Sequence, residues 1–370
     1  YSAVESNKEP IDLTKGFLME TTDSETMYSG ISYWKSKSGA VELVWEDKKI
    51  SQIKKAADKD IYMYVDQSFE TAPRLMVYSE DSKEVFQSNP QQLDFYWGRN
   101  EKIQFTSDGI KTKGILYYPA DYSEGKKHPM VVNIYERQFF SINDYINPSM
   151  SDNVGFNIHN YISKGYFVLM PDINYEFGNL KKTVTSSVLA AVEEVIAKGN
   201  VDPAKIGLIG HSFGGYETNL ILTQTGRFAA AVSGAAINDL ISSYLYIGHL
   251  SGRPDYFRAE YQQLRIGKSL YEDMQSYFNN SPVLLAADVT TPLLAWTGEK
   301  DRQVHTFQSI EFYLALRRLN KKHTLLIYPG EEHEIEEAKN AIDLNTRILQ
   351  WFDYYLKNEK KYSWFAEHYK

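Results

Sequence analysis

The chain has 370 residues, of which 43% are hydrophobic and 24% charged, with a formal net charge of -8 at pH 7. This length predicts two structural units, and the acidic balance without a basic patch argues against nucleic acid or anionic lipid as the main partner, since both attract clustered Lys and Arg. No apolar run approaches the roughly 18 residues that cross a bilayer, and the absence of cysteine excludes disulfides, thiol nucleophiles and cysteine-ligated metals.

The first part of the chain is typical of antiparallel β structure. Its apolar segments are short, rich in aromatic residues and partly alternating, with turn residues between them, at 30–34, 40–45, 60–65 and 73–78. The pattern changes near residue 100. We therefore expect a β-rich unit at residues 1–91 and a second unit at residues 92–370.

The second unit alternates between strands and helices. Buried strands are predicted at 130–134, 167–170, 206–209 and 229–233, and helices at 183–198, 307–319 and 341–357. Gly199 ends the first of these helices, and Asp202-Pro203 predicts a turn before the next strand. This alternation indicates a parallel sheet wrapped in helices.

The most specific motif is Gly210-His211-Ser212-Phe213-Gly214-Gly215, which lies between the strand at 206–209 and a predicted helix at 216–225. A serine on such a sharp strand-to-helix turn is the nucleophile elbow of an α/β-hydrolase. Glycine is needed at positions 210 and 214 because side chains there would collide where the helix approaches the strand. Ser212 is therefore the predicted nucleophile.

A nucleophilic serine needs a histidine base and a carboxylate that orients it, in the chain order Ser, Asp or Glu, His. The strand at 292–296 leads to Asp301, and the strand at 324–328 leads to His333. Consecutive parallel strands end at the same sheet edge, which predicts a catalytic triad of Ser212, Asp301 and His333. Glu299 and Asp288 remain alternatives to Asp301 as the orienting carboxylate.

Taken together, these segments resemble the prolyl oligopeptidase family of serine peptidases, particularly its dipeptidyl-peptidase-like and acylaminoacyl-peptidase-like branches. Residues 210–216 are similar to the family's elbow, 301–304 to its Asp loop and 332–333 to its histidine loop. Residues 106–109 and 113–119 resemble the start of its catalytic domain.

The resemblance covers about residues 92–358 and implies an α/β-hydrolase fold with a doubly wound, mostly parallel sheet. It also implies that residues 1–91 are the last blades of a β-propeller. At roughly 40 to 45 residues per four-stranded blade, this segment holds about two blades, too few to close a ring. We expect the chain to be a carboxyl-terminal part of a longer protein, the alternative being a small β-rich cap complete in itself.

An oxyanion hole needs two hydrogen-bond donors. The backbone N–H of Phe213 is the first expected donor, and the resemblance implies the phenol of Tyr135 as the second. The chain departs from the family where Glu136-Arg137-Gln138 follows this tyrosine, since relatives often have glycine or proline there. Tyr135 as an interface residue without a catalytic part remains the alternative, and Glu136 or Arg137 could contact a substrate terminus.

Position along the chain predicts the substrate pocket. The residues expected to line it are Ile237, Leu240, Ser243, Tyr244, Gln303 and Val304. This set predicts an apolar pocket. In the family that this chain resembles, relatives that cut after proline stack aromatic rings on it. Leu240 stands where such a ring would be expected, which argues against a preference for proline.

The expected function is hydrolysis of peptide bonds in short peptides through an acyl-enzyme intermediate. Two alternatives stay open, a carboxylesterase or other acyl hydrolase on the same fold and a non-catalytic binding protein with a relic triad. A peptide is the expected partner and a homodimer is allowed, whereas neither nucleic acid, membrane insertion, metal nor other cofactor is expected. A periplasmic or secreted location is slightly favoured over a cytoplasmic one, and the choice between exopeptidase and endopeptidase stays open.

Overall fold

The computed structural model describes residues 2–3, 14, 16–36, 38–248, 252–360 and 362–365. The chain divides into two compact units, one of residues 1–100 with 140–147 and one of residues 101–139 with 148–370. Each unit is described by itself below.

The first unit contains two four-stranded antiparallel sheets, each with its strands in chain order. The first sheet consists of β1 (Ser2–Ala3), β2 (Phe17–Thr22), β3 (Ser29–Lys35) and β4 (Gly39–Glu46). The second consists of β5 (Lys49–Lys55), β6 (Tyr62–Gln67), β7 (Arg74–Tyr78) and β8 (Ser82–Gln87), followed by the short 3₁₀ helix η1 (Pro90–Asp94). Apolar residues of both sheets form one core, which includes Ile31, Val44, Ile50, Tyr64 and Met76.

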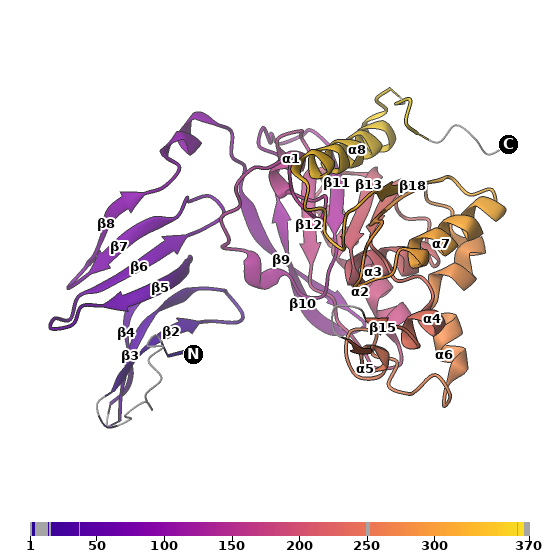
Figure 1. The fold of residues 1–370 in the computed structure, drawn as a ribbon. Coiled ribbons are helices and arrows are strands. Elements are labelled where there is room, and N and C mark those ends of the chain that lie inside the picture. The colour runs from indigo at the N-terminus through magenta and orange to yellow at the C-terminus, as the bar shows by residue number, and fades with distance from the viewer. Residues whose placement is uncertain are drawn as a thin grey trace. The chain divides into compact units, whose positions relative to one another are not determined.

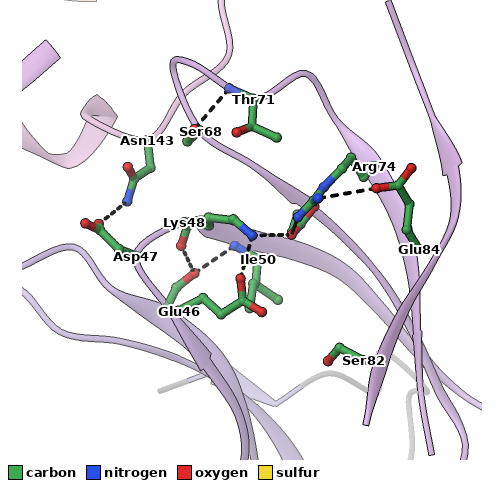
Figure 2. Close-up of polar contacts among 12 residues, drawn as sticks. Glu46, Asp47, Lys48, Ile50, Ser68, Thr71, Arg74, Ser82, Glu84 and Asn143 are labelled. Atoms are coloured by element: carbon green, nitrogen blue, oxygen red, sulfur yellow. Dashed lines mark hydrogen bonds and ion pairs between the residues drawn. The ribbon is translucent and has the colours of Figure 1, made fainter. Parts of the chain in front are cut away.

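A buried charge network lies in this unit. The Asp66 carboxylate is fully buried and accepts hydrogen bonds from Arg74 Nε at 2.9 Å and Nη2 at 2.5 Å, and from Lys48 Nζ at 3.1 Å. Figure 2 shows Lys48 and Arg74 reaching toward each other, with Glu84 beyond Arg74. Lys48 lies between β4 and β5, so the network ties the connection between the two sheets to the second sheet. Buried carboxylates require such partners because desolvation of a lone charge is costly.

The second unit is built on an eight-stranded sheet, counted over the described residues, in the order β18-β17-β14-β13-β11-β12-β10-β9. Six neighbouring strands of this sheet are parallel to one another: β18, β17, β14, β13, β11 and β12. At the end of this series, β10 pairs antiparallel with β12. Their bounds are β9 (Asn100–Ser107), β10 (Ile110–Tyr117), β11 (His128–Asn133), β12 (Phe167–Pro171), β13 (Val201–His211), β14 (Ala230–Gly234), β17 (Leu293–Gly298) and β18 (His323–Tyr328). Asp108 and Gly109 join β9 to β10 with φ of 49° and 79°, as a two-residue turn with positive φ at both positions requires.

Helices cover both faces of this sheet (Figure 1). Gly207 of β13 faces α8 (Ala338–Lys357), where a Cβ atom would lie 2.4 Å from Phe352, while its neighbours Ile206 and Leu208 belong to the core that includes α2 (Leu180–Ala197) and α3 (Phe213–Leu222). Alternate residues of one central strand therefore pack on opposite layers.

The remaining elements are short, except for α7, which packs against β17 and β18. They are η2 (Phe139–Ser141), α1 (Ile158–Ile162), α4 (Leu240–Tyr244), β15 (Ile247–Gly248), β16 (Arg253–Pro254), α5 (Tyr256–Glu260), α6 (Met274–Asn279), η3 (Pro282–Asp288) and α7 (Phe307–Arg318). Over the described residues, no helix combines the length and apolar character needed to cross a bilayer.

The predicted mostly parallel sheet is confirmed, with one local correction. Asp202-Pro203 was expected to form a turn before the strand, but both residues lie within β13. The strand is irregular there, because His128 pairs with Val201 whereas Met130 pairs with Ile206. The extra residues on β13 bulge, and a bulge accommodates a proline that a regular inner strand would not.

Candidate active site

Ser212 lies on the turn between β13 and α3, in backbone geometry that is rare for a non-glycine residue. Its φ is 58° and its ψ is -119°. A Cβ atom on Gly210 would lie 2.2 Å from the carbonyl oxygen of Gly214, and one on Gly214 would lie 2.2 Å from the carbonyl oxygen of Ile134. These contacts explain why the turn needs glycine on both sides of the serine, and strained backbone of this kind is typical of functional sites.

Ser212, His333 and Asp301 form a continuous hydrogen-bonded chain. The Ser212 Oγ lies 2.8 Å from His333 Nε2, and His333 Nδ1 lies 2.7 Å from Asp301 Oδ2. Asp301 and His333 are only 4% and 8% exposed, so both side chains are held against protein rather than water. The geometry lets His333 accept the serine proton at Nε2 while Nδ1–H donates to the carboxylate.

Backbone groups fix the Asp301 carboxylate. Its Oδ1 accepts hydrogen bonds from the backbone N–H of Gln303 and of Val304, each at 2.8 Å, which leaves Oδ2 for His333. The alternative carboxylates lie elsewhere: Glu299 accepts a hydrogen bond from the backbone N–H of Gly330, and Asp288 is exposed at the end of η3. Asp301 is thus the carboxylate that reaches the imidazole.

The two residues expected to supply the oxyanion donors, Phe213 and Tyr135, contact each other. Phe213 is the first residue of α3, where a backbone N–H has no partner inside the helix. The ring of Tyr135, just beyond β11, stacks edge-on against Phe213 with ring centroids 6.4 Å apart. Burial raises the pKa of the Tyr135 phenol, so it keeps its proton as a donor, and its oxygen lies 3.4 Å from Gln263 Nε2.

Comparison with known proteins decides the family of this site. The profile of the Prolyl oligopeptidase family matches residues 175–359, which is half of the chain and includes Ser212, Asp301 and His333. The chain belongs to the prolyl oligopeptidase family. The resemblance seen in the sequence motifs is therefore confirmed.

Individual members of the family give the extent of the likeness. An uncharacterized peptidase of Bacillus subtilis, YuxL, is 29% identical over 69% of this chain and 39% of its own length. The acylamino-acid-releasing enzyme of Sus scrofa is 25% identical over 72% of this chain and 35% of its own length. The chain thus spans little more than a third of the length of these relatives.

Solved structures share the fold at lower identity. A putative dipeptidyl aminopeptidase IV of Bacteroides ovatus has a TM-score of 0.75 at 16% identity, covering 93% of this chain and 48% of that one. An acylaminoacyl peptidase of Pyrococcus horikoshii has a TM-score of 0.69 at 18% identity, covering 90% and 54%. These likenesses show an α/β-hydrolase fold with a mostly parallel central sheet.

In this member of the family, His211 contacts the loop that carries His333. Its Nε2 donates to the backbone carbonyl of His333 at 2.9 Å, and its ring stacks on Trp296 with centroids 5.2 Å apart. Burial and the neighbouring His333 lower the pKa of His211 to about 4, so its ring is neutral near pH 7. The elbow motif contains this residue, but only its contact with His333 reveals a role in positioning.

A polar network connects Glu136, which follows Tyr135, to Glu217 of α3. Glu136 Oε1 pairs with Arg265 Nη2 at 2.7 Å, and the Arg265 guanidinium stacks 3.9 Å from the centre of the Tyr175 ring. The Tyr175 hydroxyl donates to Glu217 of α3 at 2.6 Å. Glu217 is fully buried, and this burial raises its pKa to about 8. Glu136 is thus engaged by Arg265, while Arg137 is exposed.

A cavity of about 400 Å³ opens beside Ser212. Five of the six residues expected in the substrate pocket line it: Ile237, Ser243, Tyr244, Gln303 and Val304. Leu240 is fully buried and does not line the cavity. The wall is mixed rather than apolar, because Glu311, Asp255 and Arg258 also contribute to it.

Sequence reasoning missed Gln263, Arg265, Glu217 and Glu311 as neighbours of this site. Their segments carry no motif, and Arg265 lies 129 residues from its partner Glu136. The one available signal was a charged residue inside an apolar stretch, at Glu217 directly after the elbow. Such a residue must be buried with a partner, but the sequence does not name that partner.

Proposed function

We propose that this protein is a serine peptidase that hydrolyses peptide bonds of short peptides through an acyl-enzyme intermediate. The observation that carries the proposal is the unbroken chain of short hydrogen bonds from Ser212 through His333 to Asp301. Membership of the prolyl oligopeptidase family supports the same reaction class.

In the acylation step, Ser212 Oγ attacks the carbonyl carbon of the peptide bond and His333 Nε2 takes the serine proton. The carbonyl oxygen becomes an oxyanion. His333 then gives its proton to the leaving nitrogen as the C–N bond breaks, which leaves an ester on Ser212. A water molecule repeats the sequence, with His333 as its base, and releases the acid product. Asp301 stabilises the imidazolium and fixes its tautomer throughout.

The phenol of Tyr135 and the backbone N–H of Phe213 are the proposed donors to the oxyanion. Phe213 follows Ser212 directly at the start of α3, and Tyr135 contacts the Phe213 ring and accepts a hydrogen bond from Gln263, which supports their placement near the nucleophile. Donors held in place before the reaction lower the barrier because they need no reorganisation as charge develops.

Short peptides are proposed as substrates by analogy with the relatives. Several are named acylamino-acid-releasing enzymes or dipeptidyl peptidases, and one solved acylaminoacyl peptidase holds Z-Gly-Gly-Phe-chloromethyl ketone. We also propose that residues 1–91 are blades of a β-propeller and residues 92–370 the catalytic domain. Two successive four-stranded antiparallel sheets support the propeller proposal, because one such sheet makes one blade.

Labelling with a fluorophosphonate probe tests the activated serine. We expect the wild type to be labelled and Ser212→Ala to remain unlabelled, with Ser233→Ala, a serine of β14, as the control that keeps its label. Hydrolysis of dipeptidyl and acylaminoacyl amides should accompany labelling. Robust hydrolysis of short acyl esters without any cleavage of amides would instead favour an esterase.

A further inference from the structure

The cavity beside Ser212 contains a carboxylate that the proposed triad does not use. Glu311 lies on α7 and lines the cavity that Ser212 also lines. Its Oε1 is buried and has no hydrogen-bond partner within the part of the chain that the structure describes. Burial, and to a lesser degree the charge of Asp239, raises the pKa of Glu311 to about 7. An unpaired buried acceptor is unfavourable, and a donor on a bound ligand would relieve it.

A second carboxylate of the same wall is also incompletely paired. Asp255 Oδ1 is buried without a partner among the described residues, and Oδ2 lies 3.8 Å from Arg258 Nη1. This ion pair sets the carboxylate of Asp255 against the guanidinium of Arg258 in the cavity wall. Among the described residues of this wall, the two carboxylates of Glu311 and Asp255 are accompanied by one guanidinium, that of Arg258. The described wall thus has an excess of negative charge.

Gln308, another polar side chain of the cavity wall, is hydrogen-bonded within the protein. Its Oε1 accepts the backbone N–H groups of Asn238 and Asp239 at 2.7 and 2.8 Å, and its Nε2 donates to Ser242 Oγ at 2.8 Å. Gln308 therefore fixes the wall and does not compete for a ligand. Ser242 and Ser243, which have small side chains, line the same cavity as Glu311.

We infer that this cavity binds the side chain on the amino side of the cleaved bond, and that it is built for lysine or arginine, with the cation paired to Glu311. The inference rests on the proposed peptidase function and names its substrate class. A long, flexible cationic side chain suits it because its methylene stem packs on Ile237 and Val304 while its head group supplies the N–H donors that Glu311 lacks.

Matched substrates test this directly. Two series of aminomethylcoumarin amides, one with a free and one with an acylated amino terminus, would differ only in the residue before the coumarin: lysine, arginine, norleucine or glutamate. Norleucine is the control for lysine because it keeps the stem and lacks the ammonium group. We expect kcat/KM for lysine to exceed that for norleucine about 10- to 100-fold, as for a charge-assisted hydrogen bond, and glutamate to be the poorest.

The variant Glu311→Gln keeps the size of the side chain and removes its charge, and it should bring the lysine-to-norleucine ratio close to one. Glu124→Gln removes the same charge from an exposed loop and should leave the ratio unchanged. Thermal unfolding would verify that Glu311→Gln is folded, and the wild-type preference stands as a test without any variant.

The outcomes separate this inference from the proposed function. A wild type that labels at Ser212 and cleaves norleucine as well as lysine, or a Glu311→Gln variant that retains the wild-type ratio, overturns the cationic pocket alone. A wild type that cleaves no member of either series and takes no fluorophosphonate label overturns the peptidase proposal and this inference with it.

Discussion

The two units of the molecule bury acidic side chains in opposite ways. In the β-rich unit, the fully buried Asp66 is surrounded by cations, with Arg74 and Lys48 both within 3.1 Å. In the catalytic unit, the equally buried Glu217 receives one hydroxyl hydrogen bond, from Tyr175, and its other oxygen has no partner among the described residues. The first arrangement pairs the acid with cations, whereas in the second burial raises the pKa of Glu217 and favours its protonated form.

The buried acids of the two units also differ in the groups that they bind. The hydrogen bond to Asp66 raises the pKa of Arg74, as expected for ions that stabilise each other and hold strands together. In the catalytic unit, Asp301 receives two backbone N–H groups and one imidazole, which orient it for a reaction rather than for strand pairing. The following changes test the contrast.

The largest effect is expected from Asp301→Asn. The amide keeps the shape of the carboxylate but cannot stabilise the imidazolium or hold its tautomer, so kcat should fall about 10,000-fold while the folded state persists. The rate of amide hydrolysis at saturating substrate concentration measures the loss of kcat. The control is Asp288→Asn, at the exposed alternative carboxylate, which should retain full activity. Equal losses in both variants would contradict the assignment of Asp301.

Asp66→Asn should reduce stability rather than chemistry. Removing the Asp66 carboxylate takes away the fully buried partner of Arg74 and Lys48, which keep only the more exposed Glu84 and Glu46, and the free energy of unfolding should fall by about 3 kcal/mol. Urea denaturation followed by tryptophan fluorescence measures it, with Asp58→Asn, at an exposed loop position, as the control. A loss of no more than about 0.5 kcal/mol would mean that the network is not stabilising.

Glu217→Gln should change the pH dependence of stability. Because the pKa of Glu217 is about 8 in the folded protein and about 4.5 when unfolded, the folded state holds an extra proton between these values. Its contribution to stability is therefore full below pH 4.5 and is lost as pH rises to 8, by about 3 kcal/mol between pH 5.5 and 8. Denaturation across this range should show a flatter profile for Glu217→Gln than for the wild type or for Glu194→Gln, an exposed control on α2. Parallel wild-type and variant profiles would contradict the expectation.

His211→Gln should change how stability depends on pH below about 6.5, and its effect should be the smallest of the four. The pKa of His211 is about 4 in the folded protein against 6.5 when unfolded, so the unfolded chain alone takes up this proton between those values. The wild type should lose about 2 kcal/mol of stability from this group as pH falls from 6.5 toward 4. The variant should lack this loss, and its difference from the wild type should be constant between pH 7.5 and 8.5. A wild type and variant with the same acid profile would mean that His211 is not protected from protonation.

The catalytic unit was more predictable than the details of its site. Strands β11, β12, β13, β14, β17 and β18 were all expected near their observed positions, because buried parallel strands are continuous apolar runs and the elbow motif fixes the strand before it. In the β-rich unit, β2, β5 and β8 were not predicted. In β5 and β8 many positions are exposed and polar, which weakens the alternation that marks a strand, whereas β2 interrupts it with two consecutive buried residues, Leu18 and Met19.

The sequence by itself determined the nucleophile elbow, the chain order of serine, aspartate and histidine, and the family, because these depend on short motifs whose spacing follows from local geometry. Only the tertiary structure decided that Leu240 is buried away from the cavity, that Arg265 pairs with Glu136, and that Glu311 and Ser212 line the same cavity. Those facts depend on contacts between segments far apart in the chain. Burial and pairing of charge arise when such segments meet, and no local pattern records which of them will do so.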